Sequence, residues 1–178
     1  MTLDGYCDHT AVVPDEEIHQ HYNDLMTKAG AMIYGRITYQ LMESSWPPIV
    51  KEPTGNKIMD EFAVLMDNTY KIVFSHTLKS VEWKNTRLAE RDLEEEILDI
   101  KRSGDAGDKD AYVGSPGLIA QCLDLGLLDE FQVCVHPVIA GKGLQLFKNI
   151  HDRIELKLLK TKTFACGAII FYYEPVKK

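Results

Sequence analysis

A glycine-rich turn, formed by Gly114, Ser115, Pro116 and Gly117, follows the apolar residues 111–113 and precedes another apolar segment. Glycines let a backbone approach a ligand closely, and the N–H groups of a first helical turn attract anions, most often phosphates. The turn lacks the complete G-x-G-x-x-G fingerprint. Two interpretations therefore stay open: a phosphate-binding turn, or a strand-to-helix turn that needs glycine for geometry alone.

A cation, Arg36, stands at the start of a second expected helix, over residues 35–42, which follows a buried strand over residues 31–34. A positive charge in the first turn of a helix opposes the helix dipole by about 0.3–1 kcal/mol. The sequence therefore predicts a negative group beside Arg36, either a nearby carboxylate or another anion.

Strands and helices alternate along the chain, which predicts an α/β fold with a mostly parallel sheet. Apolar residues recur at helical spacing over residues 15–29, 55–66, 92–104 and 118–123, and Gly126 suits a left-handed helix cap. Asp92 suits an N-cap, and the following run Glu94, Glu95 and Glu96 reads as a solvated helix start. Buried strands are expected over residues 71–74, 111–113 and 131–136, and a loop over residues 44–48.

The last part of the chain has two β-rich runs, residues 154–162 and 165–173, which predict an antiparallel hairpin. The hairpin is expected to finish the parallel sheet with antiparallel edge strands. It is rich in apolar residues, and a solvent-facing hairpin of this composition invites a partner. The partner expected is a second copy of the chain, giving a homodimer.

Three histidines near the start, His9, His19 and His21, raise the question of a metal site. Residues two apart on a helix point away from each other, and no cysteine or further spaced ligand joins them. We therefore expect solvent-exposed histidines and no metal.

The succession V-G-S-P-G-L-I, G-L-L-D-E-F and H-P-V-I-A-G-K-G-L-Q-L-F resembles the C-terminal half of the dihydrofolate-reductase-like family. Within that family, the likeness is to the reductase domain of the bifunctional riboflavin-biosynthesis deaminase-reductase and its stand-alone bacterial relatives. The resemblance covers nearly the whole chain. In the family, a segment similar to residues 2–6 follows the first internal strand, whereas here almost nothing precedes it. Either the printed chain starts late, or the sheet has lost a strand.

The resemblance implies a three-layer α/β domain over residues 1–178, with helices on both faces of the sheet, and an NADPH cofactor. Asp4 is then the expected polar contact to substrate and the candidate catalytic residue, although residues 4–5 also read as a plain turn. Trp46 is expected as a wall of the substrate cleft or as a hydrophobic plug. The substrate-binding residues that the resemblance implies are Leu3, Asp4, Gly5 and Trp46. The cofactor-binding residues that it implies are Gly35, Arg36, Thr38, Ser75, His76, Thr77, Gly114, Ser115, Pro116, Gly117, Leu118 and Ile119.

His76 departs from the family pattern, because relatives often carry arginine there, near the adenosine ribose phosphate. An imidazole matches that charge only when it is protonated. The alternative is that His76 is a solvated loop residue and that Arg36 or a lysine contacts the phosphate.

The function that the resemblance implies is NADPH-dependent reduction of a pterin-like or ribosylamino-pyrimidine substrate, as by a 5-amino-6-(5-phosphoribosylamino)uracil reductase. One alternative is a true dihydrofolate reductase, which needs an acidic residue on the first helix, such as Glu17 or Asp24. Another is a non-catalytic nucleotide- or drug-binding protein that has kept the cofactor groove. A deaminase is excluded, because neither H-x-E nor P-C-x-x-C occurs.

Composition and charge narrow the classes of protein to which the chain can belong. The chain has 178 residues, 45% of them hydrophobic, which suits one globular domain. A net charge of −7 disfavours nucleic acid as a partner, and no apolar run is long enough for a membrane helix. The four cysteines lie far apart in apolar segments, which is typical of a reduced, cytoplasmic protein.

Overall fold

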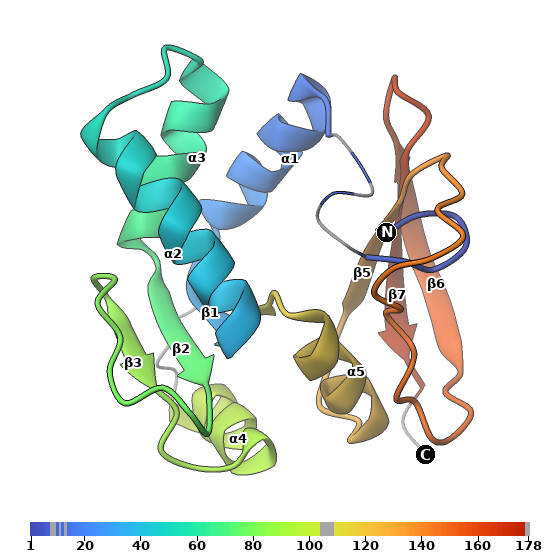
Figure 1. The fold of residues 1–178 in the computed structure, drawn as a ribbon. Helices are drawn as coiled ribbons and strands as arrows, with labels where there is room; N and C mark the ends of the chain where they lie inside the picture. The colour runs from blue at the N-terminus through green and yellow to red at the C-terminus, as the bar shows by residue number, and fades with distance from the viewer. Residues whose placement is uncertain (8–9, 11, 13, 104–108, 177–178) are drawn as a thin grey trace. The chain divides into compact units, whose positions relative to one another are not determined.

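The computed structural model describes residues 1–7, 10, 12, 14–103 and 109–176. The chain forms two compact units: a parallel-sheet unit of residues 18–118, and an antiparallel-sheet unit of residues 1–17 together with residues 119–178 (Figure 1). No helix within the described ranges is long and apolar enough to cross a membrane.

The parallel-sheet unit contains four strands in the order β3-β2-β1-β4, and every neighbouring pair is parallel. The strands are β1 (Ala29–Gly35), β2 (Tyr70–Phe74), β3 (Thr86–Leu88) and β4 (Asp110–Val113). The predicted α/β class and parallel sheet are confirmed. The short strand β3 was not predicted from the sequence. Its sequence, Thr-Arg-Leu, lacks the apolar run that marks a central strand, and all three residues are only partly buried.

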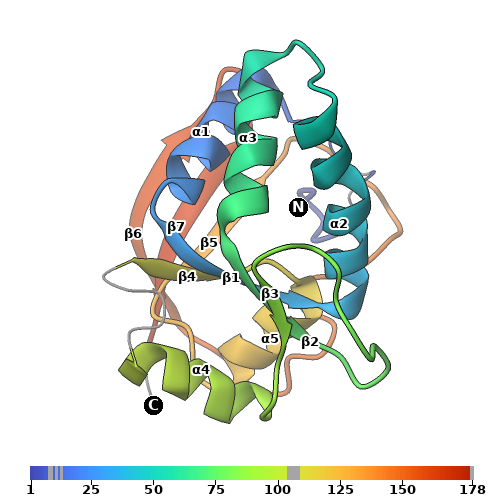
Figure 2. The ribbon, with the colours of Figure 1, turned by 90° about the vertical axis from the view of Figure 1, so that its left-hand side faces the viewer.

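Helices flank this sheet, with α2 and α3 side by side on one side of the strands and α4 on the other (Figure 2). The helices are α1 (Glu16–Met26), α2 (Arg36–Lys51), α3 (Lys57–Asn68) and α4 (Leu93–Ser103). Asn56 caps α3 by accepting from the N–H groups of Ile58 and Met59 at 3.1 and 3.2 Å. Asp92 caps α4 in the same way, accepting from the Glu95 N–H at 2.9 Å, as predicted. Gly104, expected to close α4, lies outside the described residues.

Helix α2 is longer than predicted, because it continues through the segment expected as a loop. It includes Pro47 and Pro48, whose missing N–H groups ordinarily end a helix. The helix packs along α3, and the Trp46 ring meets that of Phe62 edge-on, with the centroids 4.7 Å apart. The loop prediction was therefore wrong, since tertiary packing outweighed the local preference of proline.

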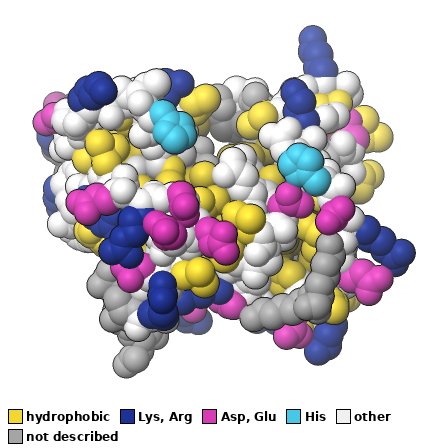
Figure 3. Space-filling view, turned by 90° about the horizontal axis from the view of Figure 1, so that it is seen from below, with side chains coloured by type: hydrophobic (Ala, Val, Ile, Leu, Met, Phe, Trp, Pro, Cys, Tyr) yellow, Lys and Arg dark blue, Asp and Glu magenta, His cyan; other side chains and the backbone are white. Residues whose placement is uncertain are grey.

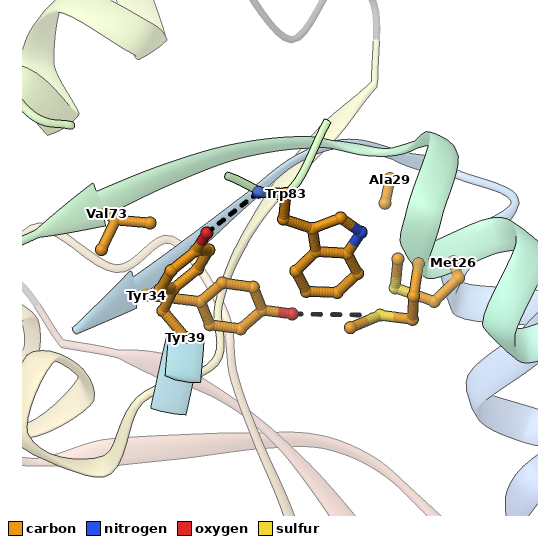
Figure 4. Packing of buried hydrophobic residues seen from close by; sticks show 7 residues of the cluster. Met26, Ala29, Tyr34, Tyr39, Val73 and Trp83 are labelled. Carbon is orange, nitrogen blue, oxygen red and sulfur yellow. Dashed lines mark hydrogen bonds between the residues drawn. The ribbon is translucent and has the colours of Figure 1, made fainter. Parts of the chain in front are cut away.

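A core of aromatic and sulfur-containing side chains lies between the sheet and helices α1 to α3 (Figure 4). The Tyr34 hydroxyl donates to the Met66 sulfur at 3.9 Å, and the Tyr39 hydroxyl accepts from the Trp83 N–H at 3.2 Å. Burial raises the pKa of Tyr39 to about 12, and the bond that its hydroxyl donates to Glu43 acts in the same direction. The polar atoms of these aromatic rings thus have partners inside the core, as buried polar groups require.

Two residues expected at the surface are buried. Glu96, placed in the solvated start of α4, is only 2% exposed and forms an ion pair with Arg87 of β3. The sequence shows the acidic run but not the strand that carries its partner. His21, expected in solvent, is 8% exposed and lies near the Tyr22 ring.

The antiparallel-sheet unit contains strands in the order β5-β7-β6, all antiparallel. Its elements are α5 (Pro116–Asp124), whose first residues belong to the other unit, β5 (Phe131–Val135), β6 (Leu156–Thr163) and β7 (Ile169–Pro175). The predicted hairpin is confirmed as β6 and β7, but it pairs with β5 in a sheet of its own. Three of its aromatic and aliphatic residues are buried, contrary to the expected solvent-facing surface: Phe164, Ile170 and Tyr172.

Helix α5 ends as the sequence predicted. Gly126 has φ of 67°, its N–H donates to the Leu123 carbonyl at 3.1 Å, and the Leu127 N–H donates to the Cys122 carbonyl at 2.8 Å. These two bonds form a Schellman motif, which satisfies the last carbonyls of the helix.

The first residues of the chain run beside the end of β5. Thr2 forms a parallel bridge with His136, the His136 N–H donates to the Met1 carbonyl at 2.9 Å, and the Leu3 N–H donates to the Val138 carbonyl at 2.8 Å. These residues therefore make ladder contacts next to β5 without forming a full strand.

Charged side chains of both signs lie on the face of the molecule that Figure 3 shows. On the face shown in Figure 3, Asp and Glu are intermixed with Lys and Arg rather than gathered into one field of a single sign. Within the described part of the chain, no group of three or more His, Cys, Asp and Glu side chains is placed to hold a metal ion.

Candidate functional site

Three of the segments predicted to bind a cofactor meet at one edge of the parallel sheet. Strand β1 ends at Gly35, which pairs with Phe74, the last residue of β2. Strand β4 ends beside Ile33 of β1, whose carbonyl accepts from the Gly114 N–H at 3.0 Å. Residues 35–38, 75–77 and 114–117 follow these strand ends directly. The carboxyl edge of a parallel sheet is where α/β proteins bind ligands.

A side-chain hydrogen bond joins two of these segments. The Ser115 hydroxyl oxygen accepts from the Gly35 N–H at 2.8 Å, and Ser115 is only 5% exposed. Gly35 is the N-cap of α2 and Pro116 is the first residue of α5, so two helices begin next to each other. Each helix start presents N–H groups that the helix itself does not use. The pair therefore suits a ligand with two adjacent phosphates.

The glycines at this edge serve different purposes. A Cβ on Gly114 would lie 2.7 Å from Cε1 of Tyr34, so Gly114 is required by the packing of that ring. A Cβ on Gly117 would meet nothing within 4 Å, and one on Gly35 would make ordinary contacts with Ser115 and Leu118. The geometric interpretation thus applies to Gly114, whereas the open space at Gly117 suits a closely approaching ligand.

Arg36 has no carboxylate partner among the residues that the structure describes. Its guanidinium donates to the neutral Gln40 side chain at 3.3 Å and is exposed in the first turn of α2. Within the described residues, therefore, no carboxylate of the chain supplies the negative group that was predicted beside Arg36. A bound anion is the remaining way to offset a cation at this helix start.

The segment after β2 forms a tight turn held by Ser75. Its hydroxyl oxygen accepts from the N–H groups of Thr77 and Leu78 at 3.2 and 3.0 Å. His76 and Thr77 are exposed at the tip of this turn. The fold thus presents the His76 imidazole to solvent at the carboxyl edge of the sheet.

Three other predicted cofactor-binding residues lie in the first turns of α5 and α2. The Leu118 side chain is 9% exposed, and Ile119 packs against the cluster that contains Leu123 and Phe131. Thr38 is partly buried in the first turn of α2. The N–H groups of Leu118 and Thr38 lie among those that the starts of α5 and α2 leave unbonded, whereas that of Ile119 falls within the hydrogen-bonded part of α5.

The expected substrate residues lie elsewhere in the chain. Trp46 packs edge-on against Phe62, and its Nε1–H donates to the Met42 sulfur at 3.2 Å, as a hydrophobic plug would. Leu3, Asp4 and Gly5 belong to the antiparallel-sheet unit, where Asp4 is exposed and Gly5 has φ of 88°. The hydrogen bond from Thr2 and those from the Gly141 and Ala140 N–H groups lower the pKa of Asp4 to about 2, so it is ionised at neutral pH.

The sequence did not reveal a buried charge at the opposite end of β2. Lys71 is fully buried, and its ammonium donates to the carbonyls of Met66 and Thr69 at 2.8 and 2.6 Å. It also lies 4.3 Å from the centroid of the Trp83 ring, and the Trp83 Nε1–H donates to Asp67 at 2.8 Å. The sequence could have indicated this buried charge, because Lys71 lies at the start of an apolar strand. At such a position, the ammonium either reaches solvent or has hydrogen-bond partners inside the protein.

Comparison with known proteins establishes the family. Residues 1–170 match the model of the RibD C-terminal domain, and the chain belongs to this family. It is therefore a riboflavin-biosynthesis reductase-like protein. The uncharacterized protein YyaP of Bacillus subtilis is 30% identical over 181 residues, which cover 97% of this chain and 90% of that protein.

Solved structures share the fold at lower identity. A putative riboflavin biosynthesis protein from Shewanella sp. PV-4 has a TM-score of 0.73 and 18% identity, covering 99% of this chain and 95% of that one. RibD of Acinetobacter baumannii has a TM-score of 0.68 and 13% identity, and the match covers 99% of this chain but 56% of that longer one. The Saccharomyces cerevisiae riboflavin biosynthesis reductase Rib7 has a TM-score of 0.61 and 12% identity, covering 98% and 86%.

Proposed function

We propose that the protein is an NADPH-dependent reductase that acts on a ribosylamino-pyrimidine, as a 5-amino-6-(5-phosphoribosylamino)uracil reductase does. The observation that carries the proposal is the pair of helix starts joined by the Ser115–Gly35 hydrogen bond, with Arg36 beside them. The family and the riboflavin-biosynthesis proteins among its structural relatives support the reaction class.

The residues at the carboxyl edge fit a nicotinamide dinucleotide. The N–H groups at the start of α5, beside Gly117, and those at the start of α2 would hold the pyrophosphate. The exposed guanidinium of Arg36 would add a charge-assisted contact, and the turn that carries His76 would contact the adenosine ribose. When bound, the cofactor supplies the hydride, while the chain binds and orients it. The first turn, residues 3–5, is the proposed substrate-binding segment.

A true dihydrofolate reductase receives no support from the acidic residues of the first helix. The Glu17 carboxylate accepts from the Ala165 N–H at 2.9 Å, within the antiparallel-sheet unit. Asp24 accepts from the Gln20 side chain at 3.1 Å and is exposed. Both carboxylates thus accept hydrogen bonds from the chain, and neither is placed by the structure as the acid that would contact a pterin.

The deciding experiment follows the absorbance of NADPH in the presence of the purified protein and candidate substrates. The proposal expects oxidation with 5-amino-6-(5-phosphoribosylamino)uracil and little with dihydrofolate or quinones. NADPH binding without turnover of any of these compounds would instead support a non-catalytic nucleotide-binding protein. A protein that binds no NADPH at all would contradict both.

Assembly as a cytoplasmic homodimer completes the proposal. None of the four cysteines forms a disulfide, which suits a reducing compartment. Strand β6 leaves three leucines exposed, Leu156, Leu158 and Leu159, and an exposed apolar strand invites pairing or cover. Light scattering should therefore give twice the chain mass of 20.2 kDa. The mass of a single chain at micromolar concentration would contradict the dimer.

A further inference from the structure

The carboxylate of Asp4 is bonded to the chain itself. Its Oδ1 accepts from the Thr2 hydroxyl at 2.6 Å and from the Ala140 N–H at 3.1 Å. Its Oδ2 accepts from the Gly141 N–H at 2.7 Å. Three donors thus converge on one exposed side chain, two of them from a loop that is more than 130 residues away in sequence.

The loop that Asp4 holds, residues 138–143, is fixed at both ends by backbone hydrogen bonds. The Leu3 N–H donates to the Val138 carbonyl at 2.8 Å, and the Cys7 N–H donates to the Leu144 carbonyl at 2.8 Å. Between these points the chain forms no regular structure, and Gly141 and Gly143 have φ of 72° and 138°. The bonds to Asp4 hold the N–H groups in the middle of the loop, and the Tyr6 hydroxyl adds a longer bond to the Gly141 carbonyl at 3.5 Å.

Exposed side chains project from this loop although its backbone is held. Ile139 is 75% exposed, and Lys142 is exposed between the two glycines. An aliphatic side chain and a flexible cation on a fixed loop are groups that can contact a ring and a phosphate of a small molecule.

We propose that Asp4 is a positioning residue, which acts on the substrate by holding residues 138–143 in place rather than by direct contact. The role in substrate binding rests on the proposed reductase function. The geometry favours this role because the chain donors already occupy both carboxylate oxygens. A substrate that bonded directly to Asp4 would have to share these oxygens with the loop.

The first test measures the loop itself and needs no activity. Trypsin cleaves after lysine, so the rate of cleavage after Lys142 reports how often the loop opens. In Asp4→Asn, an amide NH₂ replaces one accepting oxygen and faces a donor. We expect cleavage on the order of ten-fold faster, because charge-assisted hydrogen bonds are lost. Hydrogen exchange of the Ala140 and Gly141 amides should accelerate by a similar factor.

A matched control lies in the parallel-sheet unit. Asp60 is partly buried and also accepts three hydrogen bonds, from the Thr54 N–H and hydroxyl, both at 2.8 Å, and from the Gly55 N–H at 3.1 Å. Asp60→Asn should leave cleavage after Lys142 and exchange at residues 140 and 141 unchanged. Equal acceleration in both variants would show a general loss of stability and would overturn the proposal.

The second test separates positioning from direct contact. Thr2→Val keeps the Asp4 carboxylate but removes the hydroxyl that donates to it. Positioning predicts that Thr2→Val shifts loop opening and substrate KM in the same direction as Asp4→Asn, with NADPH affinity unchanged in both. Direct contact predicts a raised KM in Asp4→Asn alone, with loop protection at the wild-type level, and this result would refute the proposal. If the wild type turns over no substrate, the proposed reaction fails, while exchange and proteolysis still decide whether Asp4 holds the loop.

Discussion

The charged side chains at the two ends of strand β2 differ in whether the chain itself supplies their partners. At its amino end, Lys71 is fully buried and is satisfied by the last carbonyls of α3, while Asp67 pairs with Lys84 at 2.6 Å. At its carboxyl end, His76 is exposed, and Arg36 across the sheet has a neutral amide as its partner. The difference teaches where to look for function: charges satisfied by the chain serve stability, whereas charges without a chain counter-ion await a ligand.

The largest expected effect comes from removing the buried charge. Lys71→Met leaves the carbonyls of Met66, Asp67 and Thr69 without their donor. A buried acceptor left without its donor costs about 1–3 kcal/mol, so with three carbonyls affected the free energy of unfolding in urea should fall by at least about 3 kcal/mol. Lys84→Met is the matched control: its side chain is 53% exposed and pairs with the same Asp67, and we expect a loss of less than about 1 kcal/mol. Equal losses of unfolding free energy in Lys71→Met and Lys84→Met would contradict the distinction between the buried and the exposed lysine.

The next comparison uses two glycines of the same turn. In Gly114→Val, the added carbons collide with Tyr34, and overpacking of this kind destabilises by about 1–3 kcal/mol. In Gly117→Val, the side chain enters open space, so stability should change by less than about 1 kcal/mol. NADPH affinity should nevertheless fall at least about ten-fold, because the bulk blocks approach to the helix start. Titration of folded Gly117→Val that gave wild-type affinity would contradict a phosphate role for the turn.

The sequence predicted those parts of the fold whose causes are local. Gly126 ends α5 because only a glycine-like residue takes a left-handed cap readily, and Asp92 caps α4 because its side chain reaches the third following N–H. The positions of the segments at the carboxyl edge followed from the alternation of strands and helices. The two caps depend on residues within a few positions of each other, and the carboxyl edge depends on the order of the elements along the chain.

The failures depend on contacts between distant segments. Pro47 remains inside a helix because α2 packs on α3, and Glu96 is buried because β3 supplies Arg87. For Gly114, the sequence left ligand approach and turn geometry both open, because the ring that packs against this glycine, Tyr34, lies 80 residues earlier in the chain. Asp4 was recognised as special, but its hydrogen bonds to residues 140 and 141 could not be read from a turn sequence.

A smaller effect concerns pH and sharpens the contrast at the buried end. Burial lowers the pKa of Lys71 to about 8, although the charge of Asp67 opposes this shift. The folded state therefore binds fewer protons than the unfolded state between about pH 8 and the ordinary lysine value of 10.5, and stability rises with pH in this window. The slope can reach about 1.4 kcal/mol per pH unit. The difference in unfolding free energy between wild type and Lys71→Met should thus grow between pH 8 and 9.5 and stay flat below pH 8. A flat difference throughout would show that the ammonium is not desolvated.

The smallest expected effect lies at the carboxyl end, where His76 faces solvent. If its imidazole meets the phosphate on the adenosine ribose of NADPH, only the protonated ring offers a counter-charge. The ratio of the dissociation constants for NADH and NADPH should therefore fall several-fold between pH 6 and 8.5.

Three variants decide whether that decline belongs to His76. His76→Arg keeps a positive charge throughout the range and should flatten the pH dependence while preserving the preference for NADPH. His76→Ala should remove most of both. His151→Ala is the control, because it deletes an exposed imidazole of the antiparallel-sheet unit that pairs with Asp124, and it should behave as wild type. The phosphate itself also titrates near pH 6, so some pH dependence survives without the histidine. A profile that is the same in wild type and His76→Ala would reflect this titration alone and would assign the phosphate contact to Arg36.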